Sequence, residues 1–292
     1  MKKIGVLGCG LMGAGIAQVS AASGIETLVM EANQDLLTKG QKAIEKSLGK
    51  LLEKGKITAQ VKDDTLKNLK FTLTLGDFAD CDLVIEAVVE DLAEKRRLFG
   101  ELDKICKSET LFASNTSSLT VTEMAAATKR ADRFLGLHFF NPVPLMKLVE
   151  VVQTISTSKQ SVDLAFQFAK KIGKAPILCK DNSGFVVNLL LVPYLLDAIR
   201  AVEHHIASIE DIDKGMMLGC GHPMGPLTLL DFVGLDTTYK ISEIMFHEYR
   251  EQRYAPPPLL KKMVALGYYG KKSGRGFYDY TGETPRVADL KF

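Results

Sequence analysis

Two side chains with complementary acid–base chemistry stand twelve residues apart, His138 and Glu150. His138 ends an apolar run that predicts a strand, and Glu150 interrupts the next apolar run at 147–152. Two prolines, at 142 and 144, shape the connection, so the two side chains are expected side by side. A buried carboxylate orients an imidazole and stabilises the imidazolium that forms when the other ring nitrogen takes a proton. The pair predicts a general base that takes the hydroxyl proton during oxidation of a secondary alcohol, with a structural histidine as the alternative.

A run of hydroxyl and amide side chains, residues 114–118, follows another expected strand. A hydroxyl of this run is a candidate to bond a substrate oxygen, and the alternative is that Ser118 caps the helix that follows. Ser117, His138 and Glu150 together could suggest a hydrolase triad. The sequence holds no G-x-S-x-G elbow, however, which argues against that chemistry.

Gly8, Gly10 and Gly13 form a G-x-G-x-x-G motif directly after an expected strand and at the start of an expected helix. Gly8 permits the tight turn, Gly10 lets a pyrophosphate approach the backbone, and Gly13 lets the helix pack closely on the strand. Glu31 stands 18 residues after Gly13 and ends the second strand. A carboxylate there binds a ribose diol and repels a 2′-phosphate, so the pattern predicts NAD rather than NADP. A glycine-rich turn without a ligand is the alternative.

Lysines at 39, 42, 46, 50 and 54 recur every three or four residues, which places them along one face of a long helix. Such a face is either simply solvated or a docking strip for a polyanionic substrate, in which lysines act as point charges for phosphates. Spacing alone leaves both interpretations open.

Short apolar runs alternate with helical periods over the first part of the chain. This pattern predicts an α/β fold, a Rossmann-type and mainly parallel sheet with helices on both faces, over residues 1–183. The runs are continuous rather than alternating, as expected for strands covered on both faces. The expected strands are 3–7, 26–30, 83–87, 110–114, 133–139, 148–152 and 175–179, and the expected helices are 11–23, 33–53, 92–105 and 162–172.

The pattern changes after residue 183, and residues 184–292 are expected to form an all-helical domain. Helical periods lie near 185–203, 208–218, 225–250 and 257–266, without a convincing strand. The stretch 189–196 is more apolar than a small bundle needs, so burial against a partner subunit is expected, with burial against the first domain as the alternative. The tail from Thr281 is expected to be loosely ordered.

Composition excludes several classes of protein. The chain has 292 residues, of which 46% are hydrophobic, enough to form the hydrophobic cores of two domains. Its net charge of +2 gives no overall positive field that would attract nucleic acid. Five cysteines without a C-x-x-C pair favour a reducing compartment. No H-E-x-x-H or similar metal motif occurs. The apolar stretch 185–199 is broken by Asn188, Pro193 and Asp197, short of the ~18 residues of a spanning helix, so a soluble cytoplasmic protein is expected.

The chain resembles the 3-hydroxyacyl-CoA dehydrogenase family from about residue 3 to residue 280, because several long sequence motifs of that family occur in it in the same order. The stretches that carry the resemblance are VLGCGLMG at 6–13, ASNTSSL at 113–119, LHFFNPVP at 137–144, MKLVE at 146–150, GCGHPMGP at 219–226 and GRGFY at 274–278.

The resemblance implies roles for individual residues. His138 would take the 3-hydroxyl proton while hydride passes to the nicotinamide, and Glu150 would orient and support His138. Ser117 and Asn188 would bond the substrate oxygens. Many relatives have Arg after this asparagine, whereas here it is Leu189.

The resemblance also implies the ligand contacts. Glu90 and Lys95 would meet the nicotinamide end of NAD, and Ser47 and Lys54 would hold the phosphates and adenine end of coenzyme A. The remaining cofactor contacts would come from Gly8, Gly10, Leu11, Met12, Gly13, Glu31, Ser117 and Asn141. Family members are homodimers through the helical domain.

The sequence therefore predicts reversible NAD-linked oxidation of a (3S)-3-hydroxyacyl-CoA, of short chain such as 3-hydroxybutyryl-CoA, to the 3-oxoacyl-CoA. One rival is a dehydrogenase of the same fold that acts on a small sugar acid such as gulonate. The other is a non-catalytic dinucleotide-binding protein.

Overall fold

The computed structural model describes residues 1–291, which form two compact units, one spanning Met1–Phe185 and one beginning at Val186. Each unit has its own hydrophobic core. No helix within residues 1–291 combines the length and the apolar character that a bilayer crossing requires.

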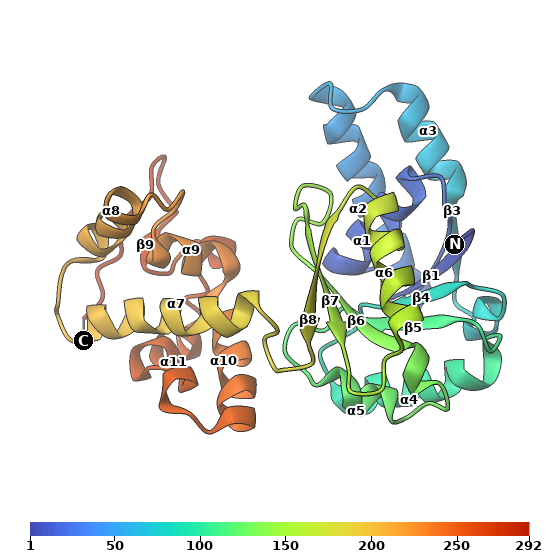
Figure 1. The fold of residues 1–292 in the computed structure, drawn as a ribbon. Helices are drawn as coiled ribbons and strands as arrows, with labels where there is room; N and C mark the ends of the chain where they lie inside the picture. Colours follow the sequence, from blue (N-terminus) through green and yellow to red (C-terminus); the bar gives the residue numbers. More distant parts are fainter. Residues whose placement is uncertain (292) are drawn as a thin grey trace. The chain divides into compact units, whose positions relative to one another are not determined.

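An eight-stranded sheet forms the centre of the first unit (Figure 1). Its order is β3-β2-β1-β4-β5-β6-β7-β8, and every neighbouring pair is parallel except β6 and β7. Strand β1 pairs with β2 on one side and β4 on the other, so its carboxyl end is a switch point where ligands bind in such sheets. The predicted Rossmann-type class is confirmed. The strands are β1 (Lys3–Leu7), β2 (Glu26–Met30), β3 (Leu69–Thr72), β4 (Leu83–Glu86), β5 (Leu111–Ser114), β6 (Phe134–Phe139), β7 (Leu148–Gln153) and β8 (Ala175–Lys180).

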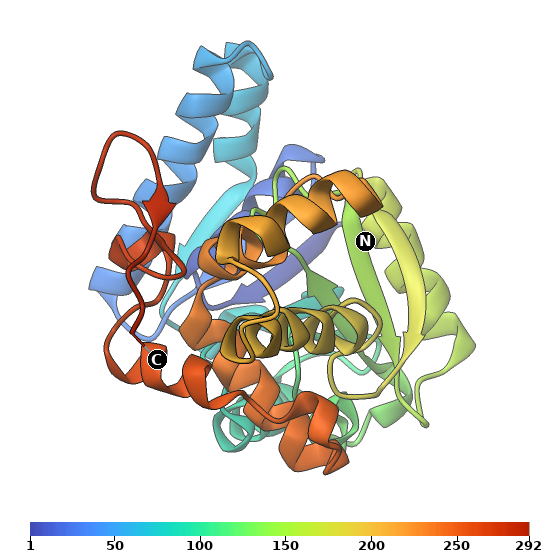
Figure 2. The ribbon, with the colours of Figure 1, turned by 90° about the vertical axis from the view of Figure 1, so that its left-hand side faces the viewer.

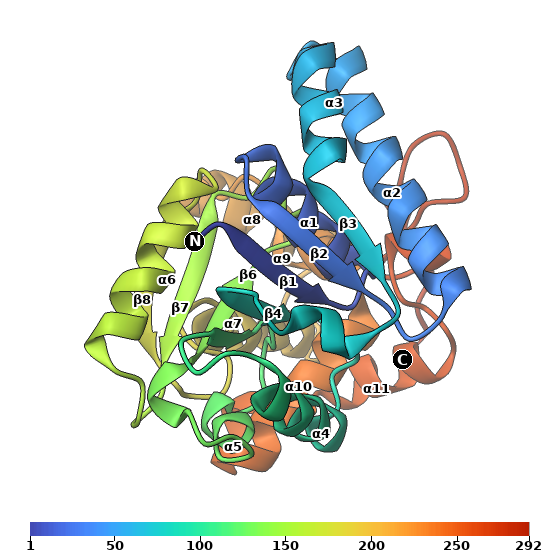
Figure 3. The same cartoon turned by 90° about the vertical axis from the view of Figure 1, so that its right-hand side faces the viewer.

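Helices cover both faces of the sheet, as Figure 3 shows. The α1 (Leu11–Ala22), α2 (Gln34–Glu53) and α6 (Lys159–Lys171) helices pack on one face with side chains such as Val6 and Ile85. The α4 (Leu92–Ile105) and α5 (Val121–Ala125) helices pack on the other, where Phe99, Phe112 and Phe134 stack with ring centroids 4.5–6.3 Å apart. The central strands β1, β4, β5, β6 and β7 bury both faces, which explains their continuous apolar runs.

The helix α3 (Ala59–Asn68) and strand β3 were not expected from the sequence. Helix α3 is almost wholly polar and buries only Thr65, and β3 is a four-residue edge strand, so neither carries a strong periodic signal. The two long helices α2 and α3 run side by side and extend beyond the sheet (Figure 3).

Five helices build the second unit, coloured yellow to red in Figure 2. They are α7 (Val187–Glu203), α8 (Ile209–Cys220), α9 (Pro226–Val233), α10 (Leu235–Tyr249) and α11 (Pro258–Ala265). The single helix expected over 225–250 is wrong, because Gly234 at φ 103° ends α9 and redirects the chain into α10.

The expectation of a second domain without strands is also wrong. A short antiparallel hairpin joins β9 (Tyr278–Asp279) to β10 (Arg286–Val287). The Asp231 carboxylate fixes it by accepting hydrogen bonds from the backbone of Phe277 (2.9 Å) and Tyr278 (2.8 Å). Part of the tail expected to be loose is therefore ordered, and Ala288 is buried.

Most of the apolar surplus of α7 is used inside the second unit. Val192, Leu195 and Leu196 are buried in its own core, and Leu189, Leu191 and Tyr194 pack against that core partly buried. Leu190 remains 65% exposed. Helix α7 is the central helix of its bundle and packs against α8, α9, α10 and α11. Burial of the rest of its apolar surface against a partner subunit stays a prediction.

Candidate functional site

His138 and Glu150 face each other across the antiparallel pair β6 and β7. The register places the two residues directly opposite, and His138 Nδ1 lies 2.6 Å from Glu150 Oε2. Both side chains are buried, and the carboxylate has no exposed surface. Nδ1 is thereby committed to the carboxylate, which leaves Nε2 as the nitrogen able to exchange a proton with a ligand.

Aromatic rings and one amide hold this pair in place. The Phe140 and Phe185 rings lie 4.6 and 5.5 Å from the His138 ring, centroid to centroid. The Asn115 side chain accepts a hydrogen bond from the Phe139 backbone (2.9 Å), which ties the end of β5 to the end of β6. These contacts fix the imidazole plane at the carboxyl end of β6.

The glycine turn between β1 and α1 has the backbone that its motif predicts. Gly8 has φ 88°, a conformation that L side chains rarely adopt. A Cβ on Gly13 would lie 1.9 Å from the Gly8 carbonyl oxygen, so the helix packs as closely as expected. Around Gly10 a Cβ would meet nothing within 4 Å, which leaves open space in front of the turn.

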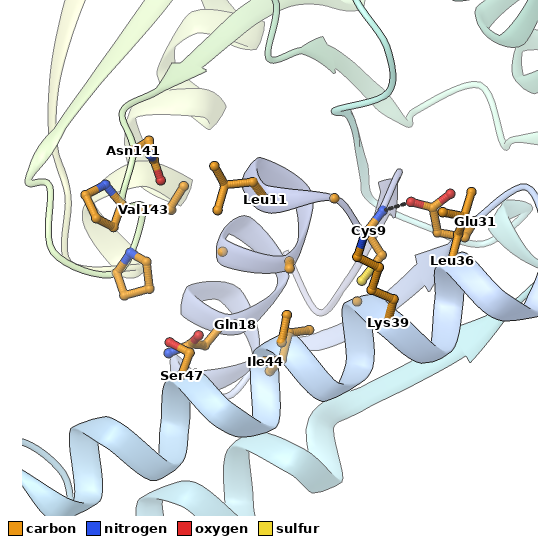
Figure 4. Close-up of a pocket in the computed structure, with 17 residues that line it drawn as sticks. Cys9, Leu11, Gln18, Glu31, Leu36, Lys39, Ile44, Ser47, Asn141 and Val143 are labelled. Carbon is orange, nitrogen blue, oxygen red and sulfur yellow. Dashed lines mark hydrogen bonds between the residues drawn. The ribbon is translucent and has the colours of Figure 1, made fainter. Parts of the chain in front are cut away.

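Glu31 reaches the same turn from the end of β2. Its Oε1 accepts a hydrogen bond from the Cys9 backbone at 2.6 Å, the dashed line in Figure 4. Its Oε2 accepts from the backbone of Ala32 at 3.1 Å. The carboxylate is thus held at the entrance of the turn, where the motif predicts a ribose contact.

Two cavities of ligand size meet at the glycine turn and Glu31. One of about 700 Å³ lies between the ends of β1, β2 and β4 and the start of α4. The other, about 480 Å³, lies between α1, α2 and the segment 141–144 (Figure 4). Gly10, Glu31 and Leu36 line both. The first cavity, with a glycine turn at its floor and a carboxylate at its rim, fits the adenosine half of a dinucleotide.

An ion network, in which Glu86 and Lys95 are buried and Glu90 is partly exposed, stands beside the first cavity. Lys95 Nζ, at the start of α4, lies 3.0 Å from Glu86 Oε1 and 2.7 Å from Glu90 Oε2. Glu90 Oε1 accepts from the Ser117 backbone at 3.2 Å and from the Thr116 hydroxyl. The two loops that follow β4 and β5 are therefore joined through one ammonium group.

Burial and charge act in opposite directions on the pKa values of this network. Burial raises the pKa of Glu86. For Lys95, burial would lower the pKa, but the Glu86 and Glu90 carboxylates outweigh it and raise the pKa. For Glu90, burial would raise the pKa, but the Lys95 charge outweighs it and lowers the pKa. Lys95 is thus held as an ammonium.

The predicted contact residues fall into distinct places. Ser117 is half-buried beside Glu90, Leu11 and Asn141 line the smaller cavity, and Met12 follows in α1. Ser47 lines the same cavity, and Lys54 is exposed at the end of α2. Asn188 lies in the first turn of α7 and belongs to the second unit.

The suggestion that Ser118 caps the following helix is wrong. The cap of α5 is the Asp181 carboxylate, which accepts from the backbones of Val121 (2.9 Å) and Thr122 (2.6 Å). Asp181 is sixty residues away in sequence, so no local pattern indicates it.

Sequence reasoning also missed three buried groups around the site. The first two are Glu86 and Asn115. The third is Lys174, which donates hydrogen bonds to the carbonyls of Val143 and Met146 and so fixes the segment that lines the smaller cavity. The signal that indicated Glu150 is a charge that interrupts an apolar run, and Glu86 shows the same signal.

Comparison with known proteins finds matches over both units of the chain. Residues 3–182 match the family described as 3-hydroxyacyl-CoA dehydrogenase, NAD binding domain, and residues 184–280 match its C-terminal domain. A 3-hydroxybutyryl-CoA dehydrogenase of Mycobacterium tuberculosis is 51% identical over 96% of this chain and 99% of its own length. The mitochondrial hydroxyacyl-coenzyme A dehydrogenase of Homo sapiens is 50% identical over 96% of this chain and 91% of its own. The crystal structure of an (S)-3-hydroxybutyryl-CoA dehydrogenase from Ralstonia eutropha superposes with a TM-score of 0.92 at 40% identity, over 97% of this chain and all of that one.

Proposed function

This chain belongs to the 3-hydroxyacyl-CoA dehydrogenase family of NAD-binding oxidoreductases, and on that premise we propose that it interconverts a (3S)-3-hydroxyacyl-CoA and the 3-oxoacyl-CoA. The observation that supports the chemistry is the 2.6 Å contact between His138 and Glu150 at the carboxyl end of β6. The glycine turn follows the carboxyl end of β1, on the same side of the sheet. The short-chain names of its relatives favour a substrate such as 3-hydroxybutyryl-CoA.

His138 is the general base of the proposed reaction. In the direction of oxidation, Nε2 takes the proton of the 3-hydroxyl group, and Nδ1 stays bonded to Glu150. The Glu150 carboxylate then neutralises the new imidazolium. NAD, when bound, accepts the hydride that leaves C3. In the opposite direction the imidazolium returns its proton to the oxygen, so the same pair serves reduction.

We assign the cofactor contacts by the same reasoning. The larger cavity would hold the adenosine half, with Glu31 accepting from the ribose diol and rejecting a 2′-phosphate. Gly8, Gly10 and Gly13 would admit the pyrophosphate onto the uncapped start of α1. The nicotinamide half would meet Glu90, Lys95, Ser117 and Asn141, with Leu11 and Met12 beside the pyrophosphate.

The coenzyme A part of the substrate would lie against α2. Ser47 lines the smaller cavity, and the lysines at 39, 42, 46, 50 and 54 are all exposed. This places positive charge along a path that ends at Lys54, where phosphates would bind. Ser117 and Asn188 would bond the substrate oxygens, Asn188 from the start of the helical unit.

A spectrophotometric assay of NADH consumption tests the proposal. We expect turnover with acetoacetyl-CoA and none with free acetoacetate. Reaction of NAD with gulonate instead would favour the sugar-acid alternative, and no NADH consumption with any substrate would favour a binding protein.

The variant Lys54→Ala separates the CoA-dependent reaction from one on a small acid. We expect it to raise the KM for acetoacetyl-CoA about fivefold, the scale of one phosphate-directed charge, and to leave the KM for NADH unchanged. Lys159→Ala, which removes an exposed lysine on α6, is the matched control and should change neither KM. Equal KM values in all three proteins would contradict CoA docking on α2.

We also propose a homodimer formed through the helical unit and a reducing, cytoplasmic location. Leu218 (76% exposed) and Phe232 (54%) leave apolar surface on that unit, and the five cysteines, all in the described part of the chain, form no disulfide. Light scattering in solution checks the assembly. A mass of 32.0 kDa, that of one chain, would contradict it.

A further inference from the structure

Glu86 is a buried carboxylate that the mechanism above does not use. It ends β4 with no exposed surface, a property that it shares with Glu150. Burying a carboxylate is costly unless hydrogen bonds and an opposite charge compensate it. Its position next to the larger cavity therefore calls for an explanation.

Three donors are directed at the Glu86 carboxylate. The Val88 backbone donates at 2.7 Å, the Ser114 hydroxyl at 2.6 Å and Lys95 Nζ at 3.1 Å. The Lys95 ammonium group lies directly against this carboxylate, and its positive charge favours the ionised form of Glu86. Glu86 is therefore an anion that joins the end of β4 to the end of β5 and to the first turns of α4.

Lys95 depends on this anion for its position. Its ammonium group is buried, with Glu86 on one side and Glu90 on the other. A lysine side chain has a flexible four-carbon stem, and only its bound partners select one rotamer. With Glu86 present, the ammonium is fixed between two carboxylates, and Glu90 in turn holds the Thr116 hydroxyl and the Ser117 backbone.

We propose that Glu86 is a positioning residue of the cofactor site, which acts through Lys95 to fix Glu90 and the turn at Thr116 and Ser117. This inference rests on the proposed contacts of Glu90, Lys95 and Ser117 with the nicotinamide half of NAD. Glu86 also gives the group of three charges a net charge of −1, since two carboxylates face one ammonium. Glu86 itself touches neither the catalytic pair nor substrate.

Titration of NADH into Glu86→Gln, followed by calorimetry, tests the inference without relying on turnover. Glutamine keeps the size and an acceptor oxygen but removes the charge that holds Lys95. We expect about a tenfold loss of NADH affinity, the scale of one charge-assisted hydrogen bond. The KM for NADH should rise by a similar factor, and kcat at saturating NADH should stay within about threefold, because His138 and Glu150 are unaltered.

Asp103→Asn is the matched control. Asp103 forms a buried ion pair with Arg130 (2.6 Å) at the other end of α4, so its loss destabilises the same helix without touching the network. We expect Asp103→Asn to lower Tm and leave the NADH dissociation constant unchanged. If both variants lower Tm and neither changes that constant, Glu86 is only a tether of α4, and the inference is wrong.

The Lys95→Met background tests whether Glu86 acts through the ammonium. There, Glu86→Gln should cause no further loss of NADH affinity, because the group that it positions is gone. A second, independent tenfold loss would overturn the inference. If Glu86→Gln does not fold, Ser114→Ala serves in its place, because it removes one bond to the same carboxylate. We expect about a threefold loss of NADH affinity from Ser114→Ala, and an unchanged affinity would overturn the inference.

The parent protein separates this inference from the proposed function. If the parent fails to bind NADH or to reduce acetoacetyl-CoA, the proposed function itself is wrong. If the parent does both and Glu86→Gln binds NADH as tightly as the parent, the inference on Glu86 alone is wrong.

Discussion

Replacement of Glu150 by glutamine probes how much the carboxylate contributes to the chemistry. The substitution keeps the shape of the side chain and removes the charge that lies 2.6 Å from His138 Nδ1. Proton transfer to Nε2 creates an imidazolium in a buried site, and the transition state then loses its counter-charge. A charge-assisted hydrogen bond contributes about 1.5–3 kcal/mol, and each 1.36 kcal/mol is tenfold in rate, so kcat should fall about 10- to 150-fold.

The assay is NADH oxidation by acetoacetyl-CoA at saturating concentrations of both, with NADH titration alongside. The dissociation constant of NADH should change by less than about twofold, because Glu150 lies in β7 and lines neither of the two cavities. A kcat within about threefold of the parent would refute the reasoning, because His138 would then work without its carboxylate. A parallel loss of NADH affinity and Tm would show instead that Glu150 supports the fold around the site.

Three further perturbations follow from particular contacts. Gly13→Ala places a Cβ 1.9 Å from the Gly8 carbonyl oxygen, so urea titration should show a loss of about 1–3 kcal/mol and calorimetry a loss of NADH binding. Gly215→Ala inside α8, where a Cβ meets nothing, should leave NADH binding unchanged and raise the free energy of unfolding by about 0.5–1 kcal/mol. Lys174→Met removes two bonds to the segment that lines the smaller cavity. The free energy of unfolding should fall by about 2 kcal/mol, and the KM for acetoacetyl-CoA should rise. An unchanged KM would show that this segment does not contact the substrate. Burial raises the pKa of Asp231 to about 6, so its protonated form is favoured by folding. That stability is present below pH 4 and lost as pH rises through 6. Relative to Asp231→Asn, the parent should lose about 2 kcal/mol between pH 4 and 7, and a difference independent of pH would contradict this.

The parts of the fold that the sequence predicts are those with strong local signals. The glycine motif fixes the β1–α1 turn because only glycine satisfies both the φ of 88° at Gly8 and the close contact at Gly13. The apolar runs of β4 and β6 predict buried strands, and the register of β6 and β7 then brings His138 opposite Glu150. The sequence therefore predicts the pairing of these two side chains.

The parts that it does not predict depend on partners distant in the chain. Asp181 caps a helix sixty residues away, and Lys95 joins Glu86 to Glu90 only after β4 and α4 have packed. The two-residue strands β9 and β10 are too short for a periodic signal and are fixed by Asp231. At Gly234, a single backbone conformation divides what is otherwise one continuous helical period.

Turnover of acetoacetyl-CoA by the His138→Gln protein tests the central claim most directly. Loss of the general base should lower kcat by about 10²- to 10⁴-fold, while NADH binds as in the parent, because the glycine turn and Glu31 are untouched. A His138→Gln protein that oxidises NADH at a rate close to the parent would contradict the assignment of the base.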